Sequence, residues 1–284
     1  MLIEISEKNQ AIVSRALSDT IDLVQEFAKS ENKKQDDKKR LVLLDLIFRQ
    51  YPNLNAVSIL LENFFRLDNQ GNNIPIGLIL RCCLEDMMYA VYLITYQDDP
   101  EVLEREIMVQ SKNAISEYIE YVIFREPEYW KCSPDRKQSI QEANKEIYET
   151  FKKDNPIFFD DTGKIKNFKK LRREIPNFRK YFNSENIDKQ GPCSMYKRIK
   201  NVDLDFSYIY FEYKFYCLFE HYSFSTRKVL ELNEFTFGHL ALSIEFILRA
   251  MVRIMGYLNV DSKYPEKINA INKSMATELL QKNE

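Results

Sequence analysis

The chain has 284 residues and a net charge of −2, so it can form one large domain or two small ones and is not a polyelectrolyte binder as a whole. Only 6 residues are glycine, about 2% where about 7% is usual. This composition argues against turn-rich β architectures and against nucleotide folds built on glycine-rich loops, and it favours helices.

Apolar residues at helical spacing dominate the N-terminal half. They predict helices over 8–29, 41–49, 54–66, 74–96 and 100–125. Pro75 suits the first turn of its helix, where a missing N–H costs nothing. The charged run at 31–40 predicts a solvated connection.

The C-terminal half predicts further helices over 133–152, 207–224 and 234–257, and a last helix that begins near Pro265. Ser133 is the expected N-cap of the first of these. Over 155–203 the periodicity decays, which predicts an irregular basic insertion with short helices. We therefore expect an all-α fold, a single helical-bundle domain of about eight helices over 1–284 with this insertion within it.

The five cysteines include no C-x-x-C pair. An odd number without that spacing predicts reduced thiols, with neither a disulfide framework nor a zinc site. No basic start followed by an apolar run opens the chain, and the most apolar stretches, 74–96 and 235–258, carry central charges. We therefore expect a cytoplasmic protein with no membrane contact, no metal and no cofactor.

Arg81 and Glu85 stand in the middle of the apolar helix 74–96 and share a stripe with three tyrosines. Burying an unpaired charge costs several kcal/mol, so both side chains need partners. A local ion pair would contribute only roughly 0.2–0.5 kcal/mol. A buried structural network and a functional pocket are the other interpretations, and the sequence does not separate them.

The two histidines, His221 and His239, are the side chains suited to proton transfer near neutral pH. His221 shares a helical face with Tyr213 and Cys217, which makes it a candidate acid or base. A hydrogen-bonded, partly buried histidine is the alternative for both, and it is the favoured interpretation of His239. Neither follows a glutamate by three residues, so a carboxylate-bridged metal pair is not expected.

Segment 161–200 carries 12 cationic and 4 anionic side chains, a charge of +8 that leaves −10 for the rest of the chain. Aromatic residues interleave with these cations, a pattern that suits single-stranded nucleic acid through phosphate contacts and stacking. The predicted nucleic-acid-binding residues are Lys169, Lys170, Arg172 and Arg173. A solvated loop held to the core by its aromatics is the favoured alternative.

Two short motifs resemble a family of uncharacterised bacterial helical proteins that is similar to the HEPN group. They are R-x-x-x-E from Arg81 to Glu85 and Y-K-x-x-C-x-x-x-H from Tyr213 to His221, within a match over about 45–225. HEPN proteins include RNases of toxin–antitoxin and phage-defence systems. HEPN ribonucleases typically carry an arginine, then four to six residues, then a histidine, and no arginine stands four to seven residues before His221, so the ribonuclease motif itself is absent.

The resemblance implies a site of Arg81, Glu85, Tyr213 and His221. In it Arg81 would hold a phosphate, His221 would act as acid or base, and Glu85 would orient one of them. We therefore expect a bacterial stress- or phage-defence-type protein, RNA-directed, with a polar cleft. The alternative is a non-enzymatic protein–protein interaction module, and either function is compatible with a homodimer.

Overall fold

The structure is a computed structural model. It describes residues 3–31, 38–67, 73–104, 106–107, 129–154, 156, 159–163, 191–219 and 234–280. The chain divides into two compact units: Met1–Pro100 with Gly191–Glu284, and Glu101–Gln190. Whether these two units fold together as the single domain predicted over 1–284 is not tested by this division, and the single domain stays a prediction.

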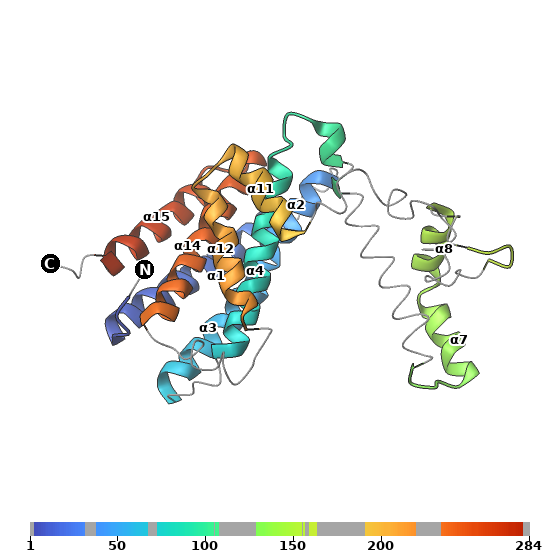
Figure 1. Cartoon of the computed structure of the whole chain (residues 1–284), viewed down its shortest axis with the longest axis horizontal. Helices are drawn as coiled ribbons and strands as arrows, with labels where there is room; N and C mark the ends of the chain where they lie inside the picture. The colour runs from blue at the N-terminus through green and yellow to red at the C-terminus, as the bar shows by residue number, and fades with distance from the viewer. Residues whose placement is uncertain are drawn as a thin grey trace. The chain divides into compact units, whose positions relative to one another are not determined.

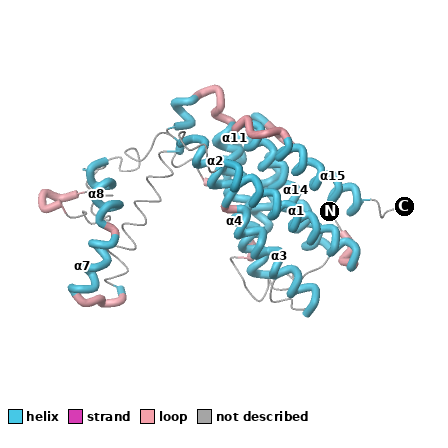
Figure 2. The backbone as a smooth tube through the Cα atoms, turned by 180° about the vertical axis from the view of Figure 1, so that it is seen from behind, coloured by secondary structure: helices cyan, strands magenta, loops and turns pink. Residues whose placement is uncertain are grey.

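All the described elements are helices, so the predicted all-α fold is confirmed (Figure 2). In the larger unit they are α1 (Glu7–Glu31), α2 (Lys38–Phe48), α3 (Gln50–Leu67), α4 (Asn73–Ile94), α11 (Pro192–Val202), the 3-10 turn η5 (Phe206–Tyr208), α12 (Ile209–Cys217), α14 (Glu234–Tyr257) and α15 (Lys263–Leu280). In the smaller unit they are α7 (Pro134–Ala143) and α8 (Lys145–Asp154).

Helix α4 is the centre of the larger unit (Figure 1). It contacts α2, α3, α11, α12 and α14. Because its sequence is apolar on nearly every side, neighbours must cover it all round. Leu80, Leu84 and Met87 are fully buried as a result.

A second group of helices completes the core behind α4. Helix α14 packs on both α4 and α15, and α1 packs on α3 and α15. Phe27 of α1 is fully buried, with its ring centroid 5.8 Å from that of Phe48 and 5.1 Å from that of Tyr264. The aromatic contacts therefore join α1 to both α2 and α15.

Most predicted helices are present, but some ends differ. Helix α14 has the predicted bounds, 234–257. Helix α3 begins at Gln50 and not at the predicted residue 54, because Pro52 fits within the first turn and does not break the helix. The predicted helix 207–224 is the short turn η5 followed by α12, and its residues from 220 onward lie outside the described part.

The predicted irregular insertion contains a regular helix. Helix α11 begins at Pro192, its first residue, and packs on α4 and η5. A proline is favourable at this first position, so it starts the helix. Its buried residues, Met195 and Ile199, are four apart on one face, a pattern too short for periodicity alone to detect.

The smaller unit is held by Tyr148 of α8. Its hydroxyl donates to the Gly163 carbonyl at 2.8 Å, and its ring meets Phe159 edge to face at 5.4 Å. Gly163 has a φ of +77°, which a residue with a side chain rarely adopts. Ser133 accepts a hydrogen bond from the Arg136 N–H at 3.3 Å, which confirms it as the N-cap of α7.

Arg40 joins three helices of the larger unit at one point. It lies on α2, forms an ion pair with Glu31 at the end of α1, and donates to the Leu258 carbonyl just after α14 at 2.8 Å. Glu31 is buried. This buried ion pair therefore fixes how the ends of α1, α2 and α14 meet.

We predict that Glu31→Ala lowers the free energy of unfolding by about 3 kcal/mol, because it leaves the Arg40 charge without its buried partner. Urea denaturation measures the change. The matched control is Arg15→Ala, which breaks an exposed pair with Glu278 and should leave the midpoint unchanged. Equal midpoints for both variants would contradict the role given to Arg40.

Candidate functional site

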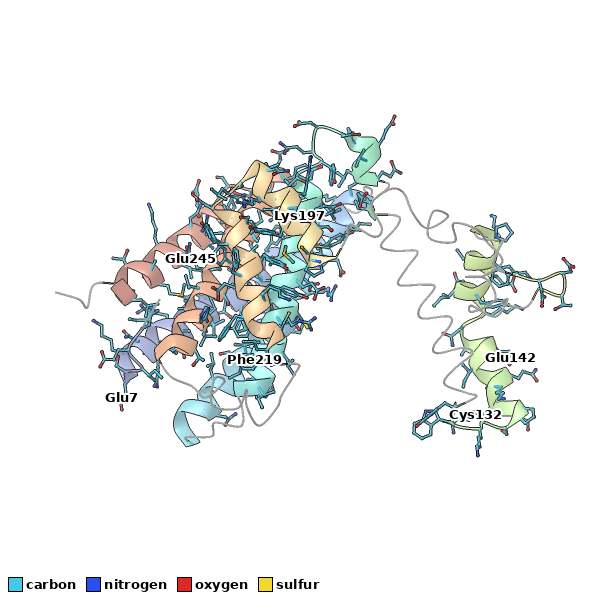
Figure 3. The ribbon with its side chains drawn as sticks, in the orientation of Figure 1. Glu7, Cys132, Glu142, Lys197, Phe219 and Glu245 are labelled. Atoms are coloured by element: carbon cyan, nitrogen blue, oxygen red, sulfur yellow. The ribbon has the colours of Figure 1, made fainter. Side chains whose placement is uncertain are left out.

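The contact between α4 and α12 brings the candidate site residues together. Gly77 of α4 permits a close approach, since a Cβ at this position would lie 2.5 Å from the ring of Phe219. Figure 3 labels Phe219, which follows α12 and is buried. The helices predicted over 74–96 and 207–224 therefore pack directly against each other.

Arg81 reaches across this contact to Tyr213. Its Nη2 donates to the Tyr213 hydroxyl at 3.4 Å, and its guanidinium carbon lies 5.4 Å from the centroid of that ring. Its Nη2 is also 3.9 Å from a carboxylate oxygen of Glu85. The structure thus joins three of the four predicted catalytic residues, while His221 lies outside the described residues.

Glu85 departs from the expected burial. Its side chain is 41% exposed, whereas that of Arg81 is 20% exposed. Glu85 lies one turn further along α4 and about 40° round it, at the edge of the contact with α12. The long ion pair with Arg81 is therefore a local surface interaction and not a buried network.

The chemistry of the cluster does not favour proton transfer near neutral pH. Burial raises the pKa of Tyr213 to about 12, a hydrogen bond from Arg81 lowers it, and one with Cys217 raises it. Burial also raises the pKa of the Cys82 thiol, although Arg81 lowers it. Both groups therefore stay protonated, so neither serves as a ready base or thiolate nucleophile.

Asp86 is a buried acid on the same helix. One oxygen lies 3.3 Å from Arg49, and the other is buried without a hydrogen-bond partner among the described residues. Burial raises the pKa of this carboxyl to about 6, against the lowering effect of Arg49. The charged form of Asp86 therefore disfavours the folded state.

The pair of Glu212 and His239 was not predicted. Nδ1 of His239 donates to a carboxylate oxygen of Glu212 at 2.8 Å, and the imidazole stacks on Phe215 with centroids 3.9 Å apart. Glu212 is buried and His239 is partly buried, and the pair links α12 to α14. Glu212 was the available signal, because it is an isolated acid in an aromatic helix.

An outward surface forms on α11, η5 and α12, which we call the α11–α12 face. It comprises Tyr196, Lys197, Lys200, Val202, Leu204, Tyr208, Phe211, Lys214 and Leu218. The ring centroid of Tyr196 lies 5.8 Å from that of Phe211, and Lys200 lies over the Tyr196 ring at 5.7 Å. Aromatic and cationic groups therefore lie side by side across the two helices, with Lys197 labelled on α11 in Figure 3.

Two polar contacts hold this face in place. Arg198 donates to the Thr95 carbonyl at 2.9 Å and lies over the Tyr96 ring, which fixes α11 to the end of α4. Asp203 accepts from the Phe206 N–H at 2.8 Å and pairs with Arg253 of α14. Burial raises the pKa of Asp203, but these hydrogen bonds outweigh it and hold the pKa below its ordinary value.

The remaining predictions have separate outcomes. Lys169, Lys170, Arg172 and Arg173 lie outside the described residues. Within the described ranges, no three His, Cys, Asp or Glu side chains gather as a metal site would require, and no helix is both long and apolar enough to cross a bilayer. Comparisons with models of protein families, with curated proteins and with solved structures find no match.

Glu212→Ala should destabilise the protein by roughly 1–3 kcal/mol, because it leaves the partly buried His239 N–H without its acceptor. Thermal or urea melts measure this loss. Glu245→Ala is the control, since it removes a half-exposed partner of Arg249 and should cost only about 0.2–0.5 kcal/mol. A smaller loss for Glu212→Ala than for the control would show that the buried pair contributes nothing.

Asp86→Asn should stabilise the protein at about pH 8, on the order of 2–3 kcal/mol, and have little effect near pH 4. The pKa of Asp86 is raised from 3.8 when the chain folds. The folded state therefore keeps a proton that the unfolded chain releases, so stability falls as pH rises from about 4 to 6. Urea denaturation of both proteins at the two pH values tests this, and equal stabilities at pH 8 would contradict it.

Proposed function

We propose that this chain is a helical interaction module that docks an acidic protein partner on the α11–α12 face. The observation that carries the proposal is the exposed apolar surface with lysines around it. Phe211 is 51% exposed, and Val202, Leu204, Tyr208 and Leu218 are similarly accessible. Contiguous apolar groups with a polar rim are typical of protein-binding surfaces.

The composition of the face supports the binding of a protein partner and not merely exposure to solvent. Aromatic side chains dominate binding energy at interfaces, and Tyr208 and Phe211 lie near one another with ring centroids 5.8 Å apart. Phe211, Lys214 and Leu218 share one side of their helix. An amphipathic helix or a similar ridge fits against such a stripe.

The charge of the face specifies the partner. Lys197, Lys200 and Lys214 are exposed on it. Asp203 is paired with Arg253, and Glu212 is buried with His239. Asp205 stays exposed at the start of η5, which leaves the lysines in excess.

A second copy of the chain fits less well. In a two-fold symmetric dimer each face would meet itself, so the lysines of the two copies would approach one another. Like charges at the rim of an interface disfavour association. An acidic partner with its own apolar surface avoids this cost.

The predicted RNA-directed, stress- or phage-defence-type function remains an alternative proposal. It is supported by the resemblance to the HEPN group and by the basic composition of 161–200. Its catalytic form needs Arg81 free for a phosphate, whereas Arg81 packs between α4 and Tyr213. We therefore favour a structural role for Arg81, beneath the docking face.

Site-specific photocrosslinking tests the docking face. Benzoylphenylalanine in place of Phe211, in the full-length chain expressed in its host cells, should give a discrete protein adduct. Lys200→Glu with Lys214→Glu should reduce its yield at least tenfold, because the acidic partner is then repelled. Lys273→Glu on α15 is the charge control and should leave the yield unchanged.

A second crosslinker position provides the control for location. Ile59 on α3 is 52% exposed, about the same exposed fraction as that of Phe211. A crosslinker at Ile59 should give no such adduct. Equal adducts at both positions, or an adduct that the charge reversals do not weaken, would contradict the proposal. An adduct with a second copy of the chain would instead support a homodimer, and an adduct with RNA would support the RNA-directed function.

A further inference from the structure

We propose that Tyr129 and Trp130 of the smaller unit form a stacking contact for single-stranded nucleic acid. This contact is separate from the α11–α12 face, and it does not rest on the proposed docking of a protein. Its substrate class is any unpaired strand, because each base offers a flat π face to an aromatic ring. The evidence is the exposure, geometry and surroundings of the two rings.

Both rings are open to solvent. Tyr129 is 77% exposed, and Trp130, the single tryptophan of the chain, is 67% exposed. Their centroids lie 5.1 Å apart with an interplanar angle of 85°, so each ring supports the other by an edge-to-face contact. Two large flat ring faces, nearly at right angles, are thus exposed to solvent and available for stacking.

The backbone after the rings has an unusual conformation. Lys131 has a φ of +49°, in the left-handed region that side chains other than glycine seldom adopt. Such a conformation costs free energy and persists only where the surrounding structure maintains it. The turn leads through Cys132 to the capped start of α7 (Figure 3), so the aromatic pair stands at the end of an ordered helix.

The surroundings favour a nucleic acid over a protein. Among the described residues from 129 to 143, the two rings are the exposed large apolar side chains. A protein hot spot needs neighbouring groups that exclude water. Here α7 is mostly polar and exposes no large apolar side chain, whereas stacking with a base needs only the ring face.

Cations accompany the rings. Lys131 follows Trp130 directly and is exposed, and Arg136 is exposed in the first turns of α7. Asp135 is the acid between them. Two cations beside a pair of aromatic rings match the alternation of phosphate and base along a single strand.

The fluorescence of Trp130 reports on this contact directly, because the chain has no other tryptophan. The full chain is titrated at low salt with a twelve-nucleotide oligo(U) and, in a second arm, oligo(dT). We expect saturable quenching, with log K falling by about 0.7 for each phosphate neutralised as salt is added. The two arms distinguish RNA from DNA as the natural strand.

Variants separate stacking from charge. Tyr129→Ala keeps the fluorescent reporter and should weaken binding about 5- to 150-fold, since one stacked base is lost. Lys131→Glu with Arg136→Glu should abolish the quenching at moderate salt. Ile147→Ala on α8 removes another exposed apolar side chain of the same unit and should change nothing.

The controls make each result decisive. Circular dichroism verifies that the variants fold, as expected for exposed positions. Lys200→Glu with Lys214→Glu, on the α11–α12 face, should leave the quenching intact. Loss of quenching in this variant would contradict the claim that the two surfaces are separate. Absence of quenching by either oligonucleotide would also overturn the proposal. So would a blue shift seen only with phosphatidylserine vesicles, which would assign the rings to a lipid surface.

Discussion

The burial of α4 is the constraint on which the larger unit depends. This helix is apolar on nearly every side, so it is stable only when other helices cover it all round. Helix α3 directly precedes α4 in the sequence and α14 comes from its C-terminal part, and α11 and α12 close the remaining side. Because α11 and α12 are short and use one face on α4, their other faces point outward. The exposed aromatics of the α11–α12 face are therefore a consequence of how α4 is covered.

The polar residues of α4 are accommodated by the same packing. Arg81 keeps a partner because Tyr213 of α12 lies opposite it, and Glu85 stays at the edge, where water solvates it. Asp86 is the costly exception, with one oxygen against Arg49 and the other buried. A cluster of this kind stabilises a helix–helix contact. Among its described residues, which do not include His221, Tyr213 and Cys82 stay protonated and Arg81 packs against Tyr213, and this is why we favour docking over catalysis.

Sequence patterns predicted the long helices well and the short ones poorly. Helix α14 has 24 residues, and its strong periodicity gave the observed bounds. Helix α11 has 11 residues, too few turns for periodicity to separate it from irregular chain, whereas α12, with 9 residues, lies inside the longer helix predicted over 207–224. The pair of Glu212 and His239 could not be derived, because spacing along one helix does not specify which residue of another helix lies opposite.

The reactivity of the thiols tests this account most directly. Cys82 and Cys83 are adjacent on α4, yet Cys82 is exposed and Cys83 is fully buried, and Cys193 is exposed at the start of α11. Alkylation of the native protein with iodoacetamide, followed residue by residue by mass spectrometry, should modify Cys193 and then Cys82. Cys83 should react only as the protein unfolds, since burial raises its pKa as well as blocking access. Labelling of Cys83 as fast as Cys82 in the folded protein would contradict the central placement of α4.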